Sequence, residues 1–335
     1  MAGRTRPPVL VTRRLPQEAL DRIAARCEMT LYDGQGAMPR DRLLAQVAGK
    51  AGAITQLTDR VDGEFLEAAG PQLTVVANCA AGFDNIDVPA CTRHGVLACN
   101  TPGVLTETTA DAAFALMMAA ARRVAEGDRF VRSGAAWIWG PLMMLGQDVH
   151  HATLGVVGFG RIGQALARRA RGFAMRVLYH DTVRPPAEVE RELAAQYRDL
   201  EDLLRESDFV SLHVSLTPQT RHLISAERLA VMKPTAVLVN TSRGPVIDEQ
   251  ALAGALQRGQ IFAAGLDVFE REPEVHPALL ACGNAVLLPH LGSATVTTRM
   301  AMADLAAGNL LAALQDSRPP ALLNPEAWER RASSG

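Results

Sequence analysis

Gly158-Phe159-Gly160-Arg161-Ile162-Gly163 is the stretch that decides the fold of this chain. An apolar run at 153–157 precedes it, and an alanine-rich helical pattern at 164–171 follows. In that setting the first glycine permits a sharp strand-to-helix turn, the second lets the backbone approach a pyrophosphate, and the third lets helix pack on strand. The next apolar run, 176–180, ends at Asp181, whose carboxylate can accept hydrogen bonds from ribose hydroxyls. The order predicts a dinucleotide-binding βαβ unit rather than glycines that serve only a tight turn.

Length and composition narrow the class of protein. The chain has 335 residues, enough for two domains of about 100–200 residues each. A formal charge of −2 is not typical of a nucleic-acid-binding protein, and we expect no nucleic-acid partner. No apolar run reaches the roughly 18 residues of a membrane span, so no membrane association is expected. The amino terminus lacks the apolar segment of a secretory signal, and the five cysteines lack metal-ligand spacing. The cytoplasm and a site without metal are therefore predicted.

Two series of strands and helices follow one another along the chain. Short apolar runs alternate with helical patterns over the first hundred residues, which predicts a parallel α/β sheet. A segment at 107–123, without proline or glycine, predicts a long buried connecting helix. A second doubly wound series begins with the fingerprint, and its strands are predicted to start near residues 154, 177, 209, 236, 263 and 285. The amphipathic pattern at 297–314 needs a surface outside this second sheet, so this helix is expected to return to the first domain.

Three segments with reactive side chains each follow a predicted strand of the second series. They carry Arg243, Glu272 and His290. Because the carboxyl ends of strands in a doubly wound sheet face the ligand crevice, these three side chains can converge beside the cofactor. An arginine holds a carboxylate or carbonyl through paired hydrogen bonds, and a histidine exchanges a proton near neutral pH. A nearby carboxylate orients that histidine and favours its charged form. The trio suits reversible hydride transfer to a 2-keto acid.

These segments, with 78–87 and 100–111, carry a resemblance to a known family. From about residue 9 to 328 the chain resembles the D-2-hydroxyacid dehydrogenases, most closely the glyoxylate/hydroxypyruvate reductase branch. The resemblance implies two doubly wound parallel-sheet domains, with a Rossmann domain (101–291) inserted into a flavodoxin-like substrate domain (1–100 plus 292–330). It implies an NAD(P)-dependent oxidoreductase that forms a homodimer. Its substrate would be a small 2-keto acid, reduced to the D-2-hydroxy acid.

The resemblance also implies roles for individual residues. Arg243 would bind the substrate carboxylate and carbonyl, and His290 would donate the proton while paired with Glu272. The backbone N–H groups of Ala81 and Gly82 would hold the carboxylate. Asp267 would contact the nicotinamide amide. The positions expected to line the cofactor are Thr109, Gly158, Gly160, Arg161, Ile162, Gly163, Asp181, Val214, Ser215, Thr220, Thr241, Ser242, Arg243, Asp267, His290 and Ser293.

Several alternatives stay open in the sequence. Trp139 and Leu142 either shape the substrate pocket of a partner subunit or belong to an ordinary core. Asp181 favours NAD(H), but Arg184 three residues later could meet the 2′-phosphate of NADP(H). Phosphite dehydrogenases of this family carry a lysine where this chain has Ala81, which argues against phosphite. NAD(H)-sensing corepressors of the same family share the trio, so a non-enzymatic binding role is a further alternative. Glyoxylate and hydroxypyruvate are the preferred substrates, but pyruvate and 2-ketogluconate share the recognised groups.

Overall fold

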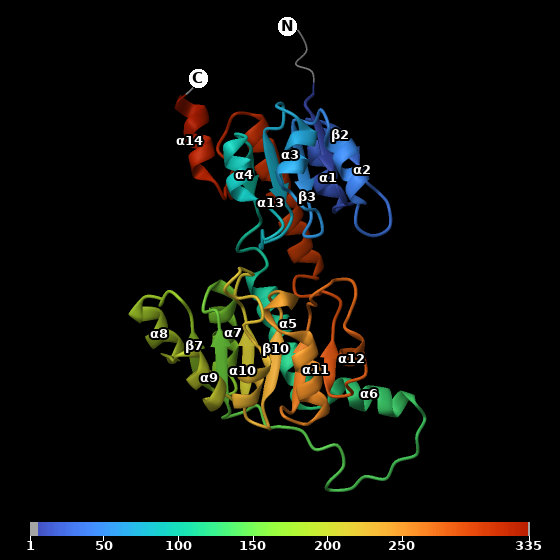
Figure 1. Cartoon of the computed structure of the whole chain (residues 1–335), viewed down its shortest axis with the longest axis vertical. Coiled ribbons are helices and arrows are strands. Elements are labelled where there is room, and N and C mark those ends of the chain that lie inside the picture. The colour runs from blue at the N-terminus through green and yellow to red at the C-terminus, as the bar shows by residue number, and fades with distance from the viewer. Residues whose placement is uncertain (1–5, 334–335) are drawn as a thin grey trace. The chain divides into compact units, whose positions relative to one another are not determined.

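The computed structural model describes residues 6–333, without the side chains of the last two, and these residues form two compact units (Figure 1). Unit 1 contains the chain up to Leu105 and again from Thr295 onward, and unit 2 contains Thr106–Ala294. The divisions lie a few residues from the domain boundaries expected from the sequence. Each unit has its own parallel sheet, which confirms the predicted fold class of two doubly wound α/β domains.

Unit 1 is built on five parallel strands in the order β2-β1-β3-β4-β5. The strands are β1 (Pro8–Val11), β2 (Glu28–Leu31), β3 (Gly52–Thr55), β4 (Val75–Asn78) and β5 (Leu97–Cys99). The helices are α1 (Gln17–Ala24), α2 (Arg40–Val47), α3 (Gly63–Ala69), α4 (Val88–Arg93), α13 (Val296–Leu314) and α14 (Pro325–Ser333). This is the flavodoxin-like strand order.

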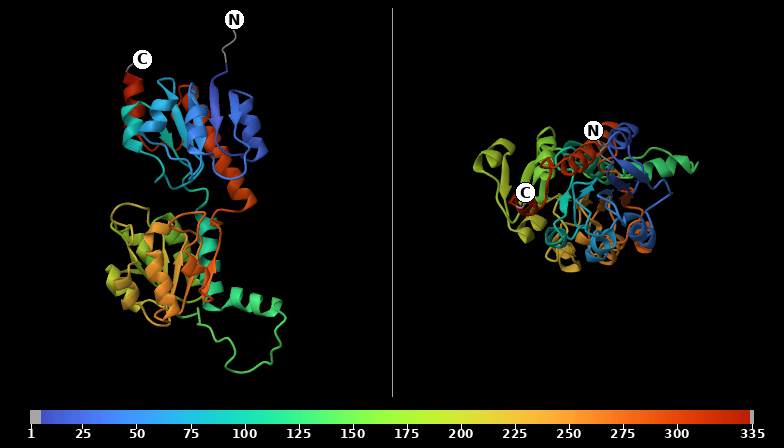
Figure 2. Two further views of the ribbon diagram at one scale, coloured as in Figure 1. Left: turned by 45° about the vertical axis from the view of Figure 1, so that its right-hand side comes forward. Right: turned by 90° about the horizontal axis from the view of Figure 1, so that it is seen from above.

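The two faces of this sheet are covered by different helices. Leu10, Ala53 and Val76 face a core shared with Leu43 of α2 and Phe65 of α3. On the other face α13 packs against β3, β4 and α1 (Figure 2). A Cβ on Gly52 would lie 2.6 Å from the Leu310 side chain, so only glycine lets α13 approach β3 this closely. The last long helix thus belongs to unit 1, as its orphan amphipathic pattern predicts.

Unit 2 is built on seven parallel strands in the order β12-β11-β10-β9-β6-β7-β8. The strands are β6 (Thr153–Val157), β7 (Arg176–His180), β8 (Ala195–Tyr197), β9 (Phe209–Leu212), β10 (Val237–Asn240), β11 (Ala263–Leu266) and β12 (Ala285–Leu287). The helices are α5 (Thr106–Ala121), α6 (Val124–Arg132), α7 (Arg161–Arg171), α8 (Ala187–Leu193), α9 (Leu200–Glu206), α10 (Ala226–Val231), α11 (Glu249–Gln257) and α12 (Pro277–Leu280), with a 3₁₀ turn at Gly244–Val246. This strand order is the Rossmann order with one added strand.

Both faces of the second sheet are buried, which its near-continuous apolar strands require. Helix α5 packs against β10, β11 and α7, and it buries Leu116 and Met117. Helices α9, α10 and α11 cover the opposite face through residues such as Leu203, Leu229 and Leu252. The predicted long buried helix is therefore α5. None of the helices in the described part of the chain is both long and apolar enough to cross a membrane.

Candidate active site and cofactor site

The strand order of unit 2 creates a switch point at the carboxyl ends of β6 and β9. From β6 the chain crosses to β7 and β8 on one side, and it then returns to β9 on the other side. Ligands of open α/β sheets bind outside the carboxyl ends of strands at such a point. This edge of unit 2 contains the fingerprint and the predicted residues that follow β7, β9, β10, β11 and β12.

The fingerprint turn has the geometry of a phosphate cradle. Gly158 has φ +92°, and a Cβ there would lie 2.7 Å from the His213 backbone. A Cβ on Gly163 would lie 2.3 Å from the Gly158 carbonyl oxygen, so helix α7 can pack against β6 only through glycine. A Cβ on Gly160 would meet nothing within 4 Å, which leaves open space before the helix. Gly160 caps α7 without a side-chain acceptor, so the N–H groups of the first turn are available to bind an anion.

A second observation at this edge also fits a dinucleotide. The hydroxyl Oγ1 of Thr241, directly after β10, is buried and has no hydrogen-bond partner among the described residues. Buried hydroxyls are normally hydrogen-bonded, so this hydroxyl is suited to a hydrogen bond with a bound ligand. Together with the Gly158–Gly163 turn, it fits the nicotinamide dinucleotide that the sequence predicts.

Asp181 is fixed at the end of β7 by hydrogen bonds to the fingerprint turn. Its Oδ2 accepts from the Phe159 N–H at 2.6 Å, and its Oδ1 accepts from the Val183 N–H at 3.3 Å. Arg184, the possible phosphate ligand, instead pairs with Glu190 of α8, with 2.8 Å between Nη2 and Oε1. Its guanidinium also lies over the ring of Tyr197, 5.0 Å from the centroid.

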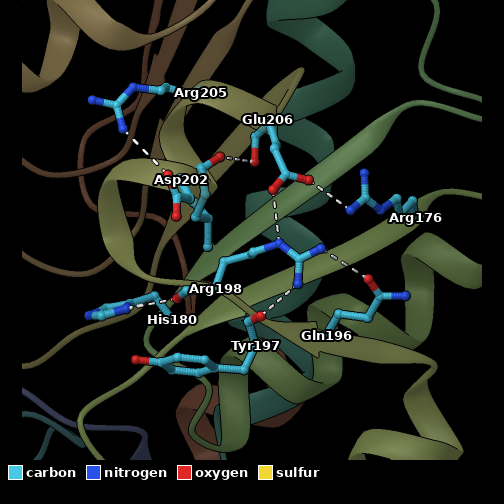
Figure 3. Close-up of polar contacts among 10 residues, drawn as sticks. Arg176, His180, Gln196, Tyr197, Arg198, Asp202, Arg205 and Glu206 are labelled. Atoms are coloured by element: carbon cyan, nitrogen blue, oxygen red, sulfur yellow. Dashed lines mark hydrogen bonds and ion pairs between the residues drawn. The ribbon is translucent and has the colours of Figure 1, made fainter.

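A network of ion pairs and hydrogen bonds extends from the amino end of β7 to the residue that precedes Asp181 (Figure 3). Glu206 of α9 accepts from Arg176 of β7 at 2.7 Å and from Arg198, directly after β8, at 2.8 Å. The Arg198 carbonyl is 3.1 Å from Nδ1 of His180, and the ring of Tyr197 packs against that histidine. These contacts join β7, β8 and α9 beside the residue that precedes Asp181.

The proposed proton donor and its carboxylate partner are hydrogen-bonded. Nδ1 of His290 lies 2.8 Å from Oε2 of Glu272, and Oε1 of Glu272 accepts from the Phe269 N–H at 3.0 Å. Side-chain exposure is 30% for His290 and 34% for Glu272, so the pair is half-buried and reachable from solvent. Because Nδ1 is directed at the carboxylate, Nε2 is the ring nitrogen that can reach a ligand.

Close packing of two loops brings Arg243 into the electrostatic range of this pair. A Cβ on Gly244 would overlap the Phe269 backbone at 1.8 Å, so the loop after β10 lies against the loop after β11. Burial raises the pKa of Glu272. The opposing contributions are larger, and they come from the hydrogen bond and charge of His290, the hydrogen bond from the Phe269 N–H and the charge of Arg243. The pKa of Glu272 therefore lies below its ordinary value. The carboxylate is therefore held in its charged form.

Asp267 has a structural role that the sequence analysis did not predict. It is buried, and its two carboxylate oxygens accept from the N–H groups of Leu291 at 2.6 Å and Gly292 at 2.7 Å. The His290 N–H donates to the Asp267 carbonyl at 2.9 Å. His290 itself has φ +57°, a left-handed conformation that few non-glycine residues adopt. Asp267 thus shapes the turn that presents His290. Its contact with the nicotinamide amide stays a prediction.

Four of the predicted residues do not belong to the carboxyl edge of the unit 2 sheet. Ala81 and Gly82 follow β4 and belong to unit 1. Trp139 and Leu142 lie in the long segment between α6 and β6, which leads to the amino end of the sheet (Figure 1). Their exposed fractions of 76% and 81% rule out the alternative of an ordinary core within one chain. The spacing of residues in the sequence did not predict that Asp267 anchors the turn at His290. It also did not predict that Arg184 pairs with Glu190.

One cavity of about 200 Å³ lies away from these residues. It is lined by Arg123, Glu126 and Ala263, among others, and so lies at the amino ends of β11 and β12. Its position excludes it as the cofactor site of a doubly wound sheet.

Comparisons with known proteins agree with this architecture. A family model described as "D-isomer specific 2-hydroxyacid dehydrogenase, NAD binding domain" matches residues 114–292. A protein named glyoxylate reductase from Thermococcus onnurineus is 49% identical over 326 residues, covering 96% of this chain and 97% of the relative. The solved structure of the TT0316 protein from Thermus thermophilus has a TM-score of 0.88 and 46% identity, covering 94% of this chain and 99% of that one.

A further solved structure was determined with bound ligands. It is the NADPH-dependent glyoxylate/hydroxypyruvate reductase of Sinorhizobium meliloti, in complex with NADP and malonate. Its TM-score is 0.83 at 32% identity, covering 96% of this chain and 98% of that one.

Proposed function

This chain belongs to the D-isomer-specific 2-hydroxyacid dehydrogenase family and is an NAD(P)-dependent oxidoreductase, and from that premise we propose that it reduces glyoxylate or hydroxypyruvate to the D-2-hydroxy acid. The observation that carries the proposal is the hydrogen bond of 2.8 Å between His290 and Glu272, at the carboxyl edge of the nucleotide-binding sheet. The substrate class is supported by the names of the relatives, which include glyoxylate reductases.

In this proposal the bound nicotinamide supplies the hydride, and the chain supplies binding and the proton. Arg243 holds the carboxylate and the carbonyl oxygen of the keto acid through its planar guanidinium. His290 donates a proton from Nε2 to that oxygen while Glu272 holds Nδ1. The backbone N–H groups of Ala81 and Gly82 bind the carboxylate. Reduction then yields a hydroxy acid and a neutral His290.

The proposed cofactor contacts are distributed along the carboxyl edge of the unit 2 sheet. The N–H groups at the start of α7, at Arg161 and Ile162, bind the pyrophosphate. Thr241 offers its unpartnered hydroxyl, and Asp181 accepts from the adenine ribose. The other proposed contacts are Thr109, Val214, Ser215, Thr220, Ser242, Asp267 and Ser293.

We expect a preference for NADH over NADPH. The charge of Asp181 repels a 2′-phosphate, and pairing with Glu190 occupies the Arg184 side chain. In Asp181→Asn, which keeps an oxygen to accept from the Phe159 N–H, the dissociation constant for NADPH is expected to fall about tenfold, or 1.4 kcal/mol. The NADH constant should change less. Fluorescence titration measures both, with Asp202→Asn as the control because the Asp202 side chain is exposed on α9. Tighter NADPH than NADH binding in the unchanged protein would contradict the preference.

Glu272→Gln is expected to shift the pH dependence of reduction. The negative charge of Glu272 lies 2.8 Å from Nδ1 of His290 and helps to hold the ring that donates the proton, so the variant should lose reductase activity at a lower pH than the parent. The lowered pKa of Glu272 also contributes stability that is present above its ordinary value of 4.5 and is lost as pH falls through the lowered value. Initial rates between pH 5 and 9 give the shift. Identical pH profiles for the variant and the parent would contradict the coupling between Glu272 and His290.

A homodimer is supported by the apolar segment that this chain exposes. None of the residues of α6 is buried, and Trp137, Trp139 and Leu142 on the following segment are more than half exposed. A second copy would cover these side chains, and they would contribute to substrate fit in the partner. We keep the cytoplasm as the expected compartment, because all five cysteines are free thiols. Light scattering checks the oligomeric state.

The decisive experiment follows NADH absorbance with glyoxylate, hydroxypyruvate, pyruvate and 2-ketogluconate, and with phosphite in the reverse direction. Turnover with glyoxylate or hydroxypyruvate supports the reductase. Tight NADH binding without any turnover would support the sensor alternative, and reduction of NAD⁺ by phosphite would support the phosphite alternative.

A further inference from the structure

Two donor atoms at one edge of the unit 1 sheet are buried without a hydrogen-bond partner among the described residues. They are Nε of Arg13 and Nε2 of Gln56. Leaving a buried donor unsatisfied costs about 1–3 kcal/mol, and each such group in a folded protein needs an explanation. Arg13 lies two residues after β1 and Gln56 directly follows β3, so both lie at the carboxyl edge of the sheet.

The register makes these two residues neighbours. Val11 pairs with Ile54, where the Thr12 N–H donates to the Ile54 carbonyl at 3.0 Å, and Arg13 and Gln56 each lie two residues beyond that pair. Arg13 is therefore opposite Gln56. Thr55 pairs with Asn78 in the same way, and the Cys79 N–H donates to the Thr55 carbonyl at 2.8 Å. Arg13, Gln56 and Cys79 thus form one row across three adjacent strands.

Alternation along the strands places this row on the face covered by α13. Leu10, Ala53 and Val76 face the core on the opposite side of the sheet. Successive side chains of a strand point to opposite faces, so the residues three positions later are on the face covered by α13. These residues are Arg13, Gln56 and Cys79. The position of Cys79 agrees with this assignment. Burial raises the pKa of its thiol to about 11, and the positive charge of Arg299, in the first turns of α13, opposes that rise. The row is therefore rich in donors and positive charge.

The main chain of Gln56 is already fully bonded, unlike its side-chain amide. Its N–H donates to Asp59 at 2.7 Å, and its carbonyl accepts from Nδ2 of Asn85 at 3.0 Å. Asp59 is itself buried, accepts from the Thr12 hydroxyl and feels the charge of Arg13. The loop is therefore held in place from within unit 1, while Nε2 of Gln56 is an unused donor among the described residues.

We propose that Gln56, with Arg13 beside it, binds an oxygen on C3 of the substrate and selects 2-keto acids that carry one. This rests on the proposed function, in which Ala81 and Gly82 hold the carboxylate, because they come two and three residues after Cys79 in the same loop. Hydroxypyruvate has a C3 hydroxyl where pyruvate has hydrogen, so it gains the contact. The preferred substrate is accordingly hydroxypyruvate rather than pyruvate.

The test compares these two substrates in Gln56→Met, which keeps the side-chain length but removes the donor. For hydroxypyruvate, kcat/KM is expected to fall about tenfold, mainly through a higher KM, as for loss of one hydrogen bond. For pyruvate it should change less than twofold. Binding of D-glycerate against D-lactate to the NAD⁺ complex, by fluorescence, should show the same selective loss without turnover.

Gln46→Met is the matched control. Gln46 also has a buried unpartnered side-chain atom, Oε1, but it lies near the end of α2, which leads to the amino end of β3. This variant should leave both substrates unchanged. If Gln56→Met folds poorly, Gln56→Glu keeps the shape of the side chain and replaces the donor with an acceptor. In this variant kcat/KM should fall for hydroxypyruvate and change little for pyruvate. Equal effects on both substrates, or none, overturn the inference. Failure of the unaltered protein to reduce either acid overturns the proposed function instead.

Discussion

His290→Ala is expected to lower kcat for glyoxylate or hydroxypyruvate reduction by about 10²–10⁴-fold, the range for loss of a positioned general acid. Water would have to protonate the carbonyl oxygen in the variant. Glu272 would also lose the partner that lies 2.8 Å from its Oε2. Single-turnover rates at saturating NADH and keto acid measure the effect on the chemical step.

His222→Ala is a suitable control for this variant. His222 is also paired with a carboxylate, with 3.2 Å between its Nε2 and Oε2 of Glu270, but it lies outside the proposed trio. It should keep most of the activity, and both variants should bind NADH nearly as the parent does. A His290→Ala protein that retains more than a tenth of kcat would remove His290 from its role as proton donor.

Arg243→Met is the second change with a large expected effect, a fall in kcat/KM of about 10²–10⁴-fold. The reason is the loss of two hydrogen bonds to a charged ligand, each contributing about 1.5–3 kcal/mol. Arg243→Lys should recover little, because an ammonium group cannot reproduce the planar paired geometry. The charge of Arg243 also helps to lower the pKa of Glu272, so the pH profile of Arg243→Met should change as well.

Steady-state kinetics with glyoxylate give this effect, and Arg258→Met is the control, since Arg258 is exposed just after α11. Equal losses in both variants would indicate a general effect of removing positive charge from unit 2. Normal kcat/KM in Arg243→Met would exclude its role in binding the substrate carboxylate.

The sequence predicted those features of the fold that depend on local chemistry. The turn at 158–163 could be read directly, because its glycines stand between an apolar run and a helical pattern, and the steric limit on Gly163 acts through Gly158, five residues away. Long apolar periodicities predicted α5 and α13, and the order of Arg243, Glu272 and His290 after successive strands predicted one edge. The sequence analysis missed β2 and β8, which are short strands at the edges of the two sheets. Edge strands bury less apolar surface, so their pattern is weak.

Other features were decided only by the tertiary structure. The hydrogen bond of Glu272 to His290, the anchoring of Leu291 and Gly292 by Asp267, and the pairing of Arg184 with Glu190 all join separate segments. The row of Arg13 and Gln56 exists only through the register of three strands far apart in the chain. Sequence alone identifies the chemical groups and the elements that carry them. Register and packing decide which groups meet, because hydrogen bonds and ion pairs act over a few ångströms, whereas the sequence separates the partners by tens of residues.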